Sequence, residues 1–300
     1  MSPPPDDGAI KNATCRQFGT EFTSLLQRMA VPEFDRGTWS TFVQVRGLAD
    51  LMAKPGLTLH GRRCIDFGCG GLKRFSVSTL LCLLGAREAM GVDLYQDPDP
   101  GAVAWAIWAL ILTAISGEGG IDPAAIGTSA KQVRERATAY DLPRLLQGDL
   151  GGLPEEVSFR LSDYRALPEA ERRFDALVSF SVFEHVHDLA DCLAAFRRAI
   201  NPDGFVYAAI DYRDHRSYVG PESWWRFMVD EGDLLPNYIT KQRHSAVVAM
   251  IERAGFRIAE SLIARADPAP EERAQFLPHY AALSDSDIRI VEARVLLRPV

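Results

Sequence analysis

The chain has 300 residues, a formal net charge of −7 and a pI near 5.5, and 47% of its residues are hydrophobic. This apolar fraction is enough to fill a sizeable core, so a folded globular protein is expected. Basic residues are scattered or adjacent to acids, and an acidic chain without a basic patch does not favour a nucleic-acid partner.

The cysteines and the two most biased segments indicate where the protein resides. The five cysteines form no CxxC pair, which is typical of reduced thiols and predicts a cytoplasmic protein. Residues 1–11 are rich in proline and aspartate and lack the features of a secretory signal, so we expect a disordered tail. The longest apolar run, residues 102–115, is shorter than the roughly 20 residues that cross a bilayer. It predicts a buried or lid helix, and no membrane partner is expected.

Helical patterns precede the first strand. Apolar spacing predicts two amphipathic helices, over residues 18–29 and 39–52. They are N-terminal cap helices, within residues 12–60, that pack on or close over the following elements. No internal repeat or low-complexity segment interrupts the chain, so we expect residues 12–300 to fold as one domain.

A strand, a glycine turn, a helix and a second strand follow. Residues 64–67 form a short apolar strand that ends in the glycine turn at residues 68–71. A helix is predicted over residues 72–84, and residues 89–94 form a strand with an acid near its end. This order of elements is a βαβ unit.

Strand and helix patterns continue to alternate to the end of the chain. Further strands are predicted at residues 157–161, 174–180, 204–210, 256–263 and 288–297. A helix over residues 189–200 ends at an Asn-Pro-Asp-Gly sequence, and another runs from about residue 245 to Arg253 before Gly255. Such alternation predicts an α/β fold with a parallel sheet covered on both faces.

Two stretches are longer than a bare sheet needs. Residues 98–156 can hold a crossover helix and still leave a long remainder, so we interpret them as an insertion that binds, covers or assembles something. Residues 211–244 follow a predicted strand and are rich in Tyr, Trp, His and Asp. Because ligands bind at the carboxyl ends of parallel strands, this segment is predicted to form one wall of a ligand site.

The glycine turn and Asp93 are the strongest ligand-binding pattern. Such a turn lets the backbone approach a ligand closely and presents free N–H groups to its negative part. The dinucleotide pattern GxGxxG would need a glycine where the chain has Lys73, which disfavours an NAD-dependent dehydrogenase. Asp93, at the tip of the second strand, can accept hydrogen bonds from both hydroxyls of an adenosine ribose. The alternative is that Asp93 caps a helix or is a solvated turn acid.

Five runs of residues, in order along the chain, resemble the motifs of class I S-adenosylmethionine (SAM)-dependent methyltransferases. They are Cys64–Gly71 (CIDFGCGG), Gly91–Leu94, Arg160–Tyr164 with Leu167-Pro168, Phe174–Val186 and Ala199–Gly204. The resemblance implies a Rossmann-like, seven-stranded, mostly parallel sheet with helices on both faces and one antiparallel strand in the final hairpin. One departure is Leu72, which stands where the third glycine of the first motif would fall.

The resemblance also implies that SAM is the cofactor and where it binds. Asp93 would bind the ribose, and Asp163 would meet the adenine amino group. The cofactor-binding residues that we predict are Asp66, Gly68, Cys69, Gly70, Asp93, Leu94, Asp163, Tyr164, Ser179 and Phe180. Phe180, Tyr164 and Tyr212 are candidate neighbours of the sulfonium, although each is also a common type of core or rim aromatic.

Candidate catalytic residues follow the fourth and fifth predicted strands. Methyl transfer requires little covalent chemistry from the protein, but a hydroxyl acceptor needs a base to remove its proton. His185 is the first candidate, because in related enzymes the Glu-His region lines the cavity. Asp211 and His215 are alternatives that orient or deprotonate the acceptor, and Arg213 could bind an acidic group on it. The competing interpretations are a structural histidine bonded to backbone and a solvated charged loop.

Other site types lack support in the sequence. His185 and His187 are spaced as HxH, but no cysteine or further histidine completes a pattern, so no metal is expected. A Ser-His-Asp hydrolase is unsupported because the chain lacks GxSxG.

The leading hypothesis is SAM-dependent methyl transfer to an oxygen or nitrogen atom of a small molecule by in-line displacement. Two alternatives stay open: a SAM-using enzyme of another type, such as cyclisation or aminocarboxypropyl transfer, and a catalytically silent SAM-binding scaffold subunit. A small-molecule acceptor is the expected partner, and assembly as a homodimer is left open.

Overall fold

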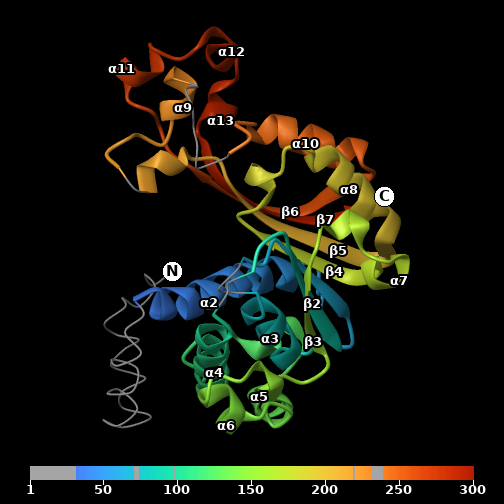
Figure 1. Ribbon diagram of the computed structural model, residues 1–300. Coiled ribbons are helices and arrows are strands. Elements are labelled where there is room, and N and C mark those ends of the chain that lie inside the picture. The colour runs from blue at the N-terminus through green and yellow to red at the C-terminus, as the bar shows by residue number, and fades with distance from the viewer. Residues whose placement is uncertain (1–31, 71–73, 97–98, 219, 231–238) are drawn as a thin grey trace. The chain divides into compact units, whose positions relative to one another are not determined.

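The computed structural model describes residues 32–70, 74–96, 99–218, 220–230 and 239–300, with backbone alone for residues 32–37 and 39 (Figure 1). The predicted tail at residues 1–11 and the predicted helix at residues 18–29 lie outside the described residues.

Seven strands form one sheet in the order β3-β2-β1-β4-β5-β7-β6, with helices on both sides. The strands are β1 (Arg63–Phe67), β2 (Glu88–Asp93), β3 (Val157–Leu161), β4 (Phe174–Phe180), β5 (Ile200–Asp211), β6 (Phe256–Arg265) and β7 (Ile290–Pro299). β2 pairs with β3 and β4 pairs with β5 in parallel, whereas β7 is antiparallel to both β5 and β6. The predicted Rossmann-like fold class, with its antiparallel strand in the final hairpin, is confirmed.

Contacts within the chain divide it into two compact units. The first unit comprises Met1–Cys64 and Cys69–Leu161, and the second comprises Ile65–Gly68 and Ser162–Val300. The boundary crosses β1, so each unit holds part of the turn that follows that strand.

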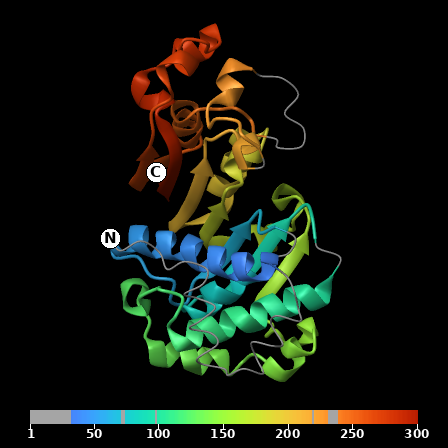
Figure 2. The ribbon, with the colours of Figure 1, turned by 90° about the vertical axis from the view of Figure 1, so that its left-hand side faces the viewer.

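Helices of the first unit pack around a long apolar helix. They are α2 (Pro32–Ala53), α3 (Ser76–Leu83), α4 (Pro100–Ser116), α5 (Ala130–Ala137) and α6 (Leu142–Leu146), with the 3-10 helices η1 (Pro123–Ile126) and η2 (Leu150–Gly152). α4 contacts α2, α3, α5 and α6, and Figure 2 shows α2 and α4 alongside each other. The predicted insertion at residues 98–156 therefore consists of α4 and the short helices that follow it.

α4 begins and ends as its sequence predicts for a buried helix. The Asp99 carboxylate accepts hydrogen bonds from the N–H groups of Gly101 and Ala102, and Gly117 ends the helix at a φ of +80°. Ile107 and Ile111 are fully buried, so the apolar run packs inside the protein. Within the described part of the chain, none of the helices combines the length and hydrophobicity needed to cross a membrane.

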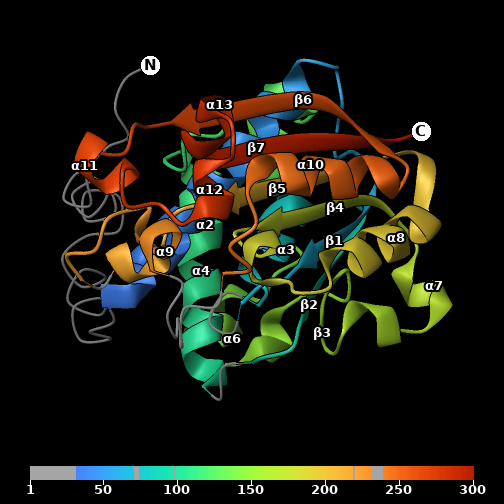
Figure 3. The ribbon, with the colours of Figure 1, turned by 90° about the horizontal axis from the view of Figure 1, so that it is seen from above.

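Helices of the second unit flank the strands β4, β5, β7 and β6. They are α7 (Glu169–Arg172), α8 (Leu189–Ala199), α9 (Arg226–Val229), α10 (His244–Arg253), α11 (Pro270–Arg273), α12 (Pro278–Ala281) and α13 (Asp285–Ile288). The 3-10 helices are η3 (Tyr164–Ala166), η4 (Phe183–His185) and η5 (His215–Tyr218). α8 and α10 lie side by side (Figure 3). η4 follows β4 and η5 follows β5, so both lie just past the carboxyl ends of neighbouring parallel strands.

The turn predicted before the fifth strand is an irregularity inside β5. The register with β4 passes from Phe174↔Ile200 to Ala176↔Phe205, so extra residues of β5 are accommodated between these pairs. A Cβ on Gly204 would lie 2.7 Å from the carbonyl oxygen of Asp175, which explains the glycine there. The predicted start of the strand at Gly204 was thus too late. The strand pairs with β4 before the Asn-Pro-Asp-Gly sequence, at Ile200, and again after it, from Phe205.

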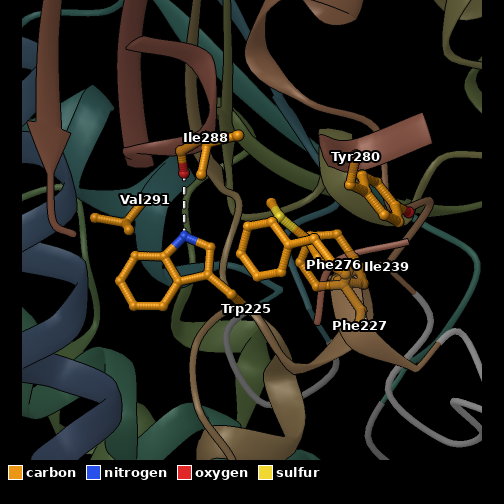
Figure 4. Packing of buried hydrophobic residues seen from close by; sticks show 8 residues of the cluster. Trp225, Phe227, Ile239, Phe276, Tyr280, Ile288 and Val291 are labelled. Atoms are coloured by element: carbon orange, nitrogen blue, oxygen red, sulfur yellow. Dashed lines mark hydrogen bonds between the residues drawn. The ribbon is translucent and has the colours of Figure 1, made fainter. Parts of the chain in front are cut away.

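A separate apolar cluster forms where α9 meets the connection between β6 and β7, and sequence analysis did not predict it. Its members are Trp225, Phe227, Met228, Ile239, Phe276, Tyr280, Ile288 and Val291 (Figure 4). The indole N–H of Trp225 donates to the carbonyl oxygen of Ile288 at 3.0 Å. The short helices α12 and α13 therefore belong to a packed substructure with its own small core.

The described cysteines, Cys64, Cys69, Cys82 and Cys192, are free and buried. This agrees with the prediction of reduced thiols at core positions.

Candidate functional site

Asp93 lies against the glycine turn of the first unit. The N–H of Gly70 donates to Asp93 Oδ2 at 2.7 Å, and the N–H of Tyr95 donates to Oδ1 at 2.9 Å. Gly70 has a φ of +75°, a conformation that glycine adopts without strain. A carboxylate oxygen that accepts one hydrogen bond can accept another, so half-buried Asp93 keeps the capacity to bind two hydroxyl groups.

The residues around Asp93 leave room for the turn and expose an apolar side chain. A Cβ on Gly91 would lie 2.4 Å from the carbonyl oxygen of Arg74 and 3.0 Å from Cys69 Sγ. Only glycine therefore allows β2 and the turn to approach this closely. Leu94, a predicted cofactor contact, is 65% exposed and free to meet an apolar ligand surface.

The second unit holds the earlier part of the turn, with Asp66 and Gly68. Asp66 is buried, and Gly68 has a φ of +72°. A Cβ on Gly68 would lie 2.4 Å from Val182 Cγ2, so any side chain there would meet both backbone strain and a clash. The conformation of the turn is therefore fixed by local packing as well as by φ.

Asp163, the predicted adenine acceptor, is bonded to Arg165. Its carboxylate caps η3 by accepting the Arg165 N–H at 2.8 Å and also accepts bonds from the Arg165 guanidinium. These side-chain hydrogen bonds hold the pKa of Asp163 below its usual value, so the group is an ionised acceptor. Arg165 also bonds Asp188, which fixes the guanidinium against both acids.

Tyr164 is a core residue rather than a wall of a ligand site. Its side chain is 1% exposed, its hydroxyl donates to the carbonyl oxygen of Arg172 at 2.8 Å, and its ring packs against Phe67 and Phe196. Of the two interpretations of its ring, a core aromatic or a neighbour of the sulfonium, its burial favours the first. Only the backbone of Tyr164 is left to contact a cofactor.

Ser179 and Phe180 end β4. Ser179 is fully buried, and its hydroxyl oxygen has no hydrogen-bond partner among the described residues. Phe180 is 8% exposed, with its ring centroid 5.4 Å from that of Tyr207. Ser181, which follows, has a φ of +55°, a strained value for a residue other than glycine. Such strain is common at functional sites.

Glu184, His185 and His215 form a cluster within the second unit. Each offers one metal-ligand atom, and these atoms all lie within 4.8 Å of one another. The rings of His185 and His215 meet edge to face at a centroid distance of 4.9 Å. The structure thus brings together two of the predicted catalytic residues, whereas His187 is exposed and outside the cluster. The sequence pattern did not indicate this grouping, because it considered only cysteines and further histidines beside the HxH pair and not Glu184.

Burial decides the protonation of the cluster. It raises the pKa of Glu184 to about 8, and the negative charge of Asp211 acts in the same direction. Burial also lowers the pKa of His215, partly offset by Asp211. His215 is therefore a neutral imidazole at pH 7, able to accept a proton or bind a metal.

Asp211, the third predicted catalytic residue, is held by its neighbours. Arg213 donates to both of its oxygens, at 2.8 and 2.9 Å, and the Tyr218 hydroxyl bonds Oδ2. Although burial alone would raise it, the pKa of Asp211 lies below its usual value because of these bonds. An ionised, fully bonded carboxylate is a weak base, so Asp211 positions its surroundings. Its Oδ2 lies 3.8 Å from His215 Nε2.

Two further candidate site residues of this segment, Arg213 and Tyr212, are also engaged by their neighbours. Arg213 was expected to bind an acidic group on the acceptor, but its guanidinium is committed to Asp211 and lies over the rings of Tyr218 and Trp224. Tyr212, a candidate sulfonium neighbour, is 3% exposed, and its hydroxyl is 3.2 Å from His244 Nδ1. Both side chains serve the internal structure of the second unit.

Sequence reasoning missed Glu184 and Tyr218 as site residues. The Glu-His pair directly after a predicted strand was the available signal for Glu184. Nothing local to Tyr218 distinguishes it from other loop tyrosines, because its role depends on the fold of residues 211–218.

A sequence match agrees with the motifs over part of the chain. The sheet has the strand arrangement that the motifs imply, and residues 121–208 match the family model for a methyltransferase domain. SAM is the cofactor that this match indicates. The matched segment contains Asp163 and the Glu184–His185 pair, whereas the glycine turn and Asp93 precede it.

Several solved structures are similar to the chain at low identity. One is a SAM-dependent methyltransferase from Mesorhizobium loti, at 15% identity over 82% of this chain and 95% of that chain, with a TM-score of 0.43. Another is the [4+2]-cyclase SpnF, at 16% over 84% and 80%, with a TM-score of 0.44. A third is the cyclopropane synthase MmaA2 from Mycobacterium tuberculosis, at 15% over 84% and 81%, with a TM-score of 0.43. No curated protein matches the sequence.

Proposed function

We propose that the chain transfers the sulfonium methyl group of SAM to an oxygen or nitrogen atom of a small molecule by in-line displacement. The observation that carries this proposal is the Asp93 carboxylate, which two backbone N–H groups orient at the end of β2. A prepositioned bidentate acceptor suits the two hydroxyls of the cofactor ribose.

The remaining cofactor contacts are proposed from the motifs that contain them. The backbone of Gly68, Cys69 and Gly70 is open to close approach because glycine occupies two of these positions at positive φ. Asp163 is ionised and suits the adenine amino group, which is a hydrogen-bond donor. Asp66, Leu94, Ser179 and Phe180 complete the proposed set, and Tyr164 contributes through its backbone.

Methyl transfer requires alignment more than covalent help from the protein. The acceptor lone pair attacks the methyl carbon while the carbon–sulfur bond breaks and a neutral thioether leaves. Holding the reactants in line contributes several kcal/mol, up to about 7 to 11 in well-oriented intramolecular reactions. We therefore assign most of the rate enhancement to binding and orientation.

Proton removal from a hydroxyl acceptor falls to the two histidines. His215 is kept neutral by burial and can accept a proton at pH 7, and His185 lies beside it. Asp211 acts on His215 through its negative charge, as a positioning residue rather than a base. An acidic net charge and buried free thiols support a small-molecule acceptor and a cytoplasmic location.

The proposal is tested by binding and by product mass. S-adenosylhomocysteine, the product form of the cofactor, should bind the purified chain in a calorimetric titration. Incubation with SAM and a panel of hydroxyl- and amine-bearing acceptors should yield a product heavier by one methyl group. A cyclised or aminocarboxypropyl product would replace this function with another SAM chemistry, and binding without turnover on a broad panel would favour a scaffold role.

A further inference from the structure

The cluster of Glu184, His185 and His215 has the composition of a metal site. Glu184 and His185 come from η4 after β4, and His215 comes from η5 after β5. β4 and β5 are parallel neighbours, so their carboxyl ends lie at one edge of the sheet. The three ligand atoms approach within 4.8 Å of one another, close enough for a single ion to contact all of them after small side-chain rotations.

The cluster holds buried polar atoms that lack hydrogen-bond partners within the described residues. Glu184 is 5% exposed, and neither of its carboxylate oxygens has a hydrogen-bond partner within the described residues. His215 Nε2 is likewise buried and unbonded. Buried polar atoms are nearly always paired, because leaving them unpaired forfeits their hydration. One cation bound between them would satisfy all of these atoms at once.

The neighbouring cation does not fill this role. Arg213 directs its guanidinium to Asp211, at 2.8 and 2.9 Å, and also packs on Tyr218. Asp211 in turn places a second carboxylate near the cluster, with Oδ2 3.8 Å from His215 Nε2. Arg213 is therefore committed to Asp211 and does not compete for Glu184 and the two histidines.

We propose that Glu184, His185 and His215 bind a divalent first-row transition metal ion. Two imidazole nitrogens with one carboxylate oxygen suit Mn²⁺, Fe²⁺, Co²⁺ or Zn²⁺, whereas Mg²⁺ and Ca²⁺ prefer all-oxygen sets. Three protein ligands leave coordination positions open for water or a substrate. Asp211, held by Arg213 and Tyr218, is the positioning residue beside the ligands.

The site also defines an acceptor class, an inference that rests on the proposed function. An acceptor hydroxyl that binds an open position on the metal ion becomes more acidic. With a metal ion bound, His185 and His215 act as its ligands and not as proton acceptors, so the O–H bond breaks and the proton passes to solvent. The oxygen lone pair then forms the bond to the methyl carbon as the carbon–sulfur bond breaks, and sulfur keeps the electron pair. Hydroxyl-bearing acceptors that can ligate a metal are thus favoured over amines.

The test is a Mn²⁺ titration of the full-length chain after removal of metals with EDTA and dialysis. Electron paramagnetic resonance of free Mn²⁺ should show a single bound ion per chain. Glu184→Gln and His215→Ala should each weaken binding by about tenfold or more, since loss of even an outer-shell partner costs that much. His187→Ala, an exposed histidine outside the cluster, should bind Mn²⁺ like the unmodified chain.

Absence of Mn²⁺ binding by the folded chain would overturn the proposal, as would equal affinity in Glu184→Gln, His215→Ala and the unmodified chain. Far-ultraviolet circular dichroism shows whether each variant is folded, and S-adenosylhomocysteine binding in the same samples reports separately on the proposed function. Cofactor binding without Mn²⁺ binding removes the metal site and leaves the proposed function. Mn²⁺ binding without cofactor binding supports the metal site and contradicts the proposed function.

Discussion

Single residues account for the strongest part of the proposed cofactor site. Asp93 is oriented by two backbone N–H groups, so its carboxylate needs no reorganisation when a ligand arrives. Gly68 and Gly91 are required by steric contacts of 2.4 Å that a Cβ would make. In each case the backbone geometry or the charge at that position favours one residue type.

Replacing Asp93 should weaken cofactor binding. We expect Asp93→Ala to reduce S-adenosylhomocysteine affinity by about 1 to 3 kcal/mol, the range for losing hydrogen bonds to a charged group. Asp93→Asn should give a smaller loss, because its amide oxygen still accepts while its amide nitrogen does not. Isothermal titration calorimetry measures both. Glu135→Ala, an exposed change on α5, is the matched control, and unchanged affinity in a folded Asp93→Ala variant would refute the ribose assignment.

Replacing His185 should separate binding from chemistry. Because His185 is not among the residues that we propose to contact the cofactor, His185→Ala should retain cofactor affinity. Turnover should fall by about 10²-fold or more, the usual contribution of a base. Initial rates with a methylated-product assay, alongside calorimetric affinity, provide the measurement. Full activity in His185→Ala would exclude the residue from the reaction.

At the scale of elements, patterns with a local cause were predictable and those with a tertiary cause were not. The strands around the glycine turn were placed because an apolar run, a glycine turn and an acid occur within a short stretch. The irregularity at Gly204 was missed, because it depends on how β5 pairs with β4. The helices α12 and α13 were missed too, since Tyr280 and Ile288 pack in the Trp225 cluster, which helical periodicity does not predict.

The same distinction holds for the candidate site. Asp93 could be assigned from its position at a strand end. The grouping of Glu184 with His215 could not, because the two residues are distant in sequence and meet only through the courses of η4 and η5. The core location of Tyr164 likewise depends on Phe67 and Phe196, which lie on other elements.

The start of α4 offers a test at this scale. Asp99 accepts two backbone N–H bonds that would otherwise lack partners within the helix. Asp99→Ala should lower the free energy of unfolding by about 1 kcal/mol, as for other N-caps. Asp99→Asn keeps an accepting oxygen and should lose less. Denaturant unfolding followed by circular dichroism compares the two, and equal stability of both with the unmodified chain would contradict the capping role.

At the scale of the whole molecule, buried neutral histidines make stability depend on pH. Burial lowers the pKa of His244, partly offset by Asp287, and burial lowers the pKa of His215 as well. In the unfolded chain these groups take up protons near pH 6.5, whereas in the folded chain they do so only at lower pH. Their contribution to stability is therefore present above pH 6.5 and is lost as the pH falls below that value.

We expect His244 to contribute a decrease in the free energy of unfolding from pH 7 to pH 5, against the opposite contribution of Glu184, whose pKa burial raises to about 8; the measurement is made in EDTA so that no metal contributes. His244→Gln removes the titrating group and keeps a polar partner for Tyr212. Its slope should be smaller by at most about 1.4 kcal/mol per pH unit, the value for one proton. His60→Gln, at an exposed histidine, should follow the unmodified chain. An unchanged slope in His244→Gln would rule out this account.

The buried thiols allow the opening of each compact unit to be followed separately. Burial raises the pKa of Cys82 to about 12 and that of Cys192 to about 11, so almost no thiolate exists at neutral pH in the folded chain. Alkylating reagents attack thiolates, and these sulfurs become reactive only when their surroundings open. Cys82 lies in the first unit and Cys192 in the second. The order in which mass spectrometry finds them modified would therefore show which half of the protein opens first, without any engineered label.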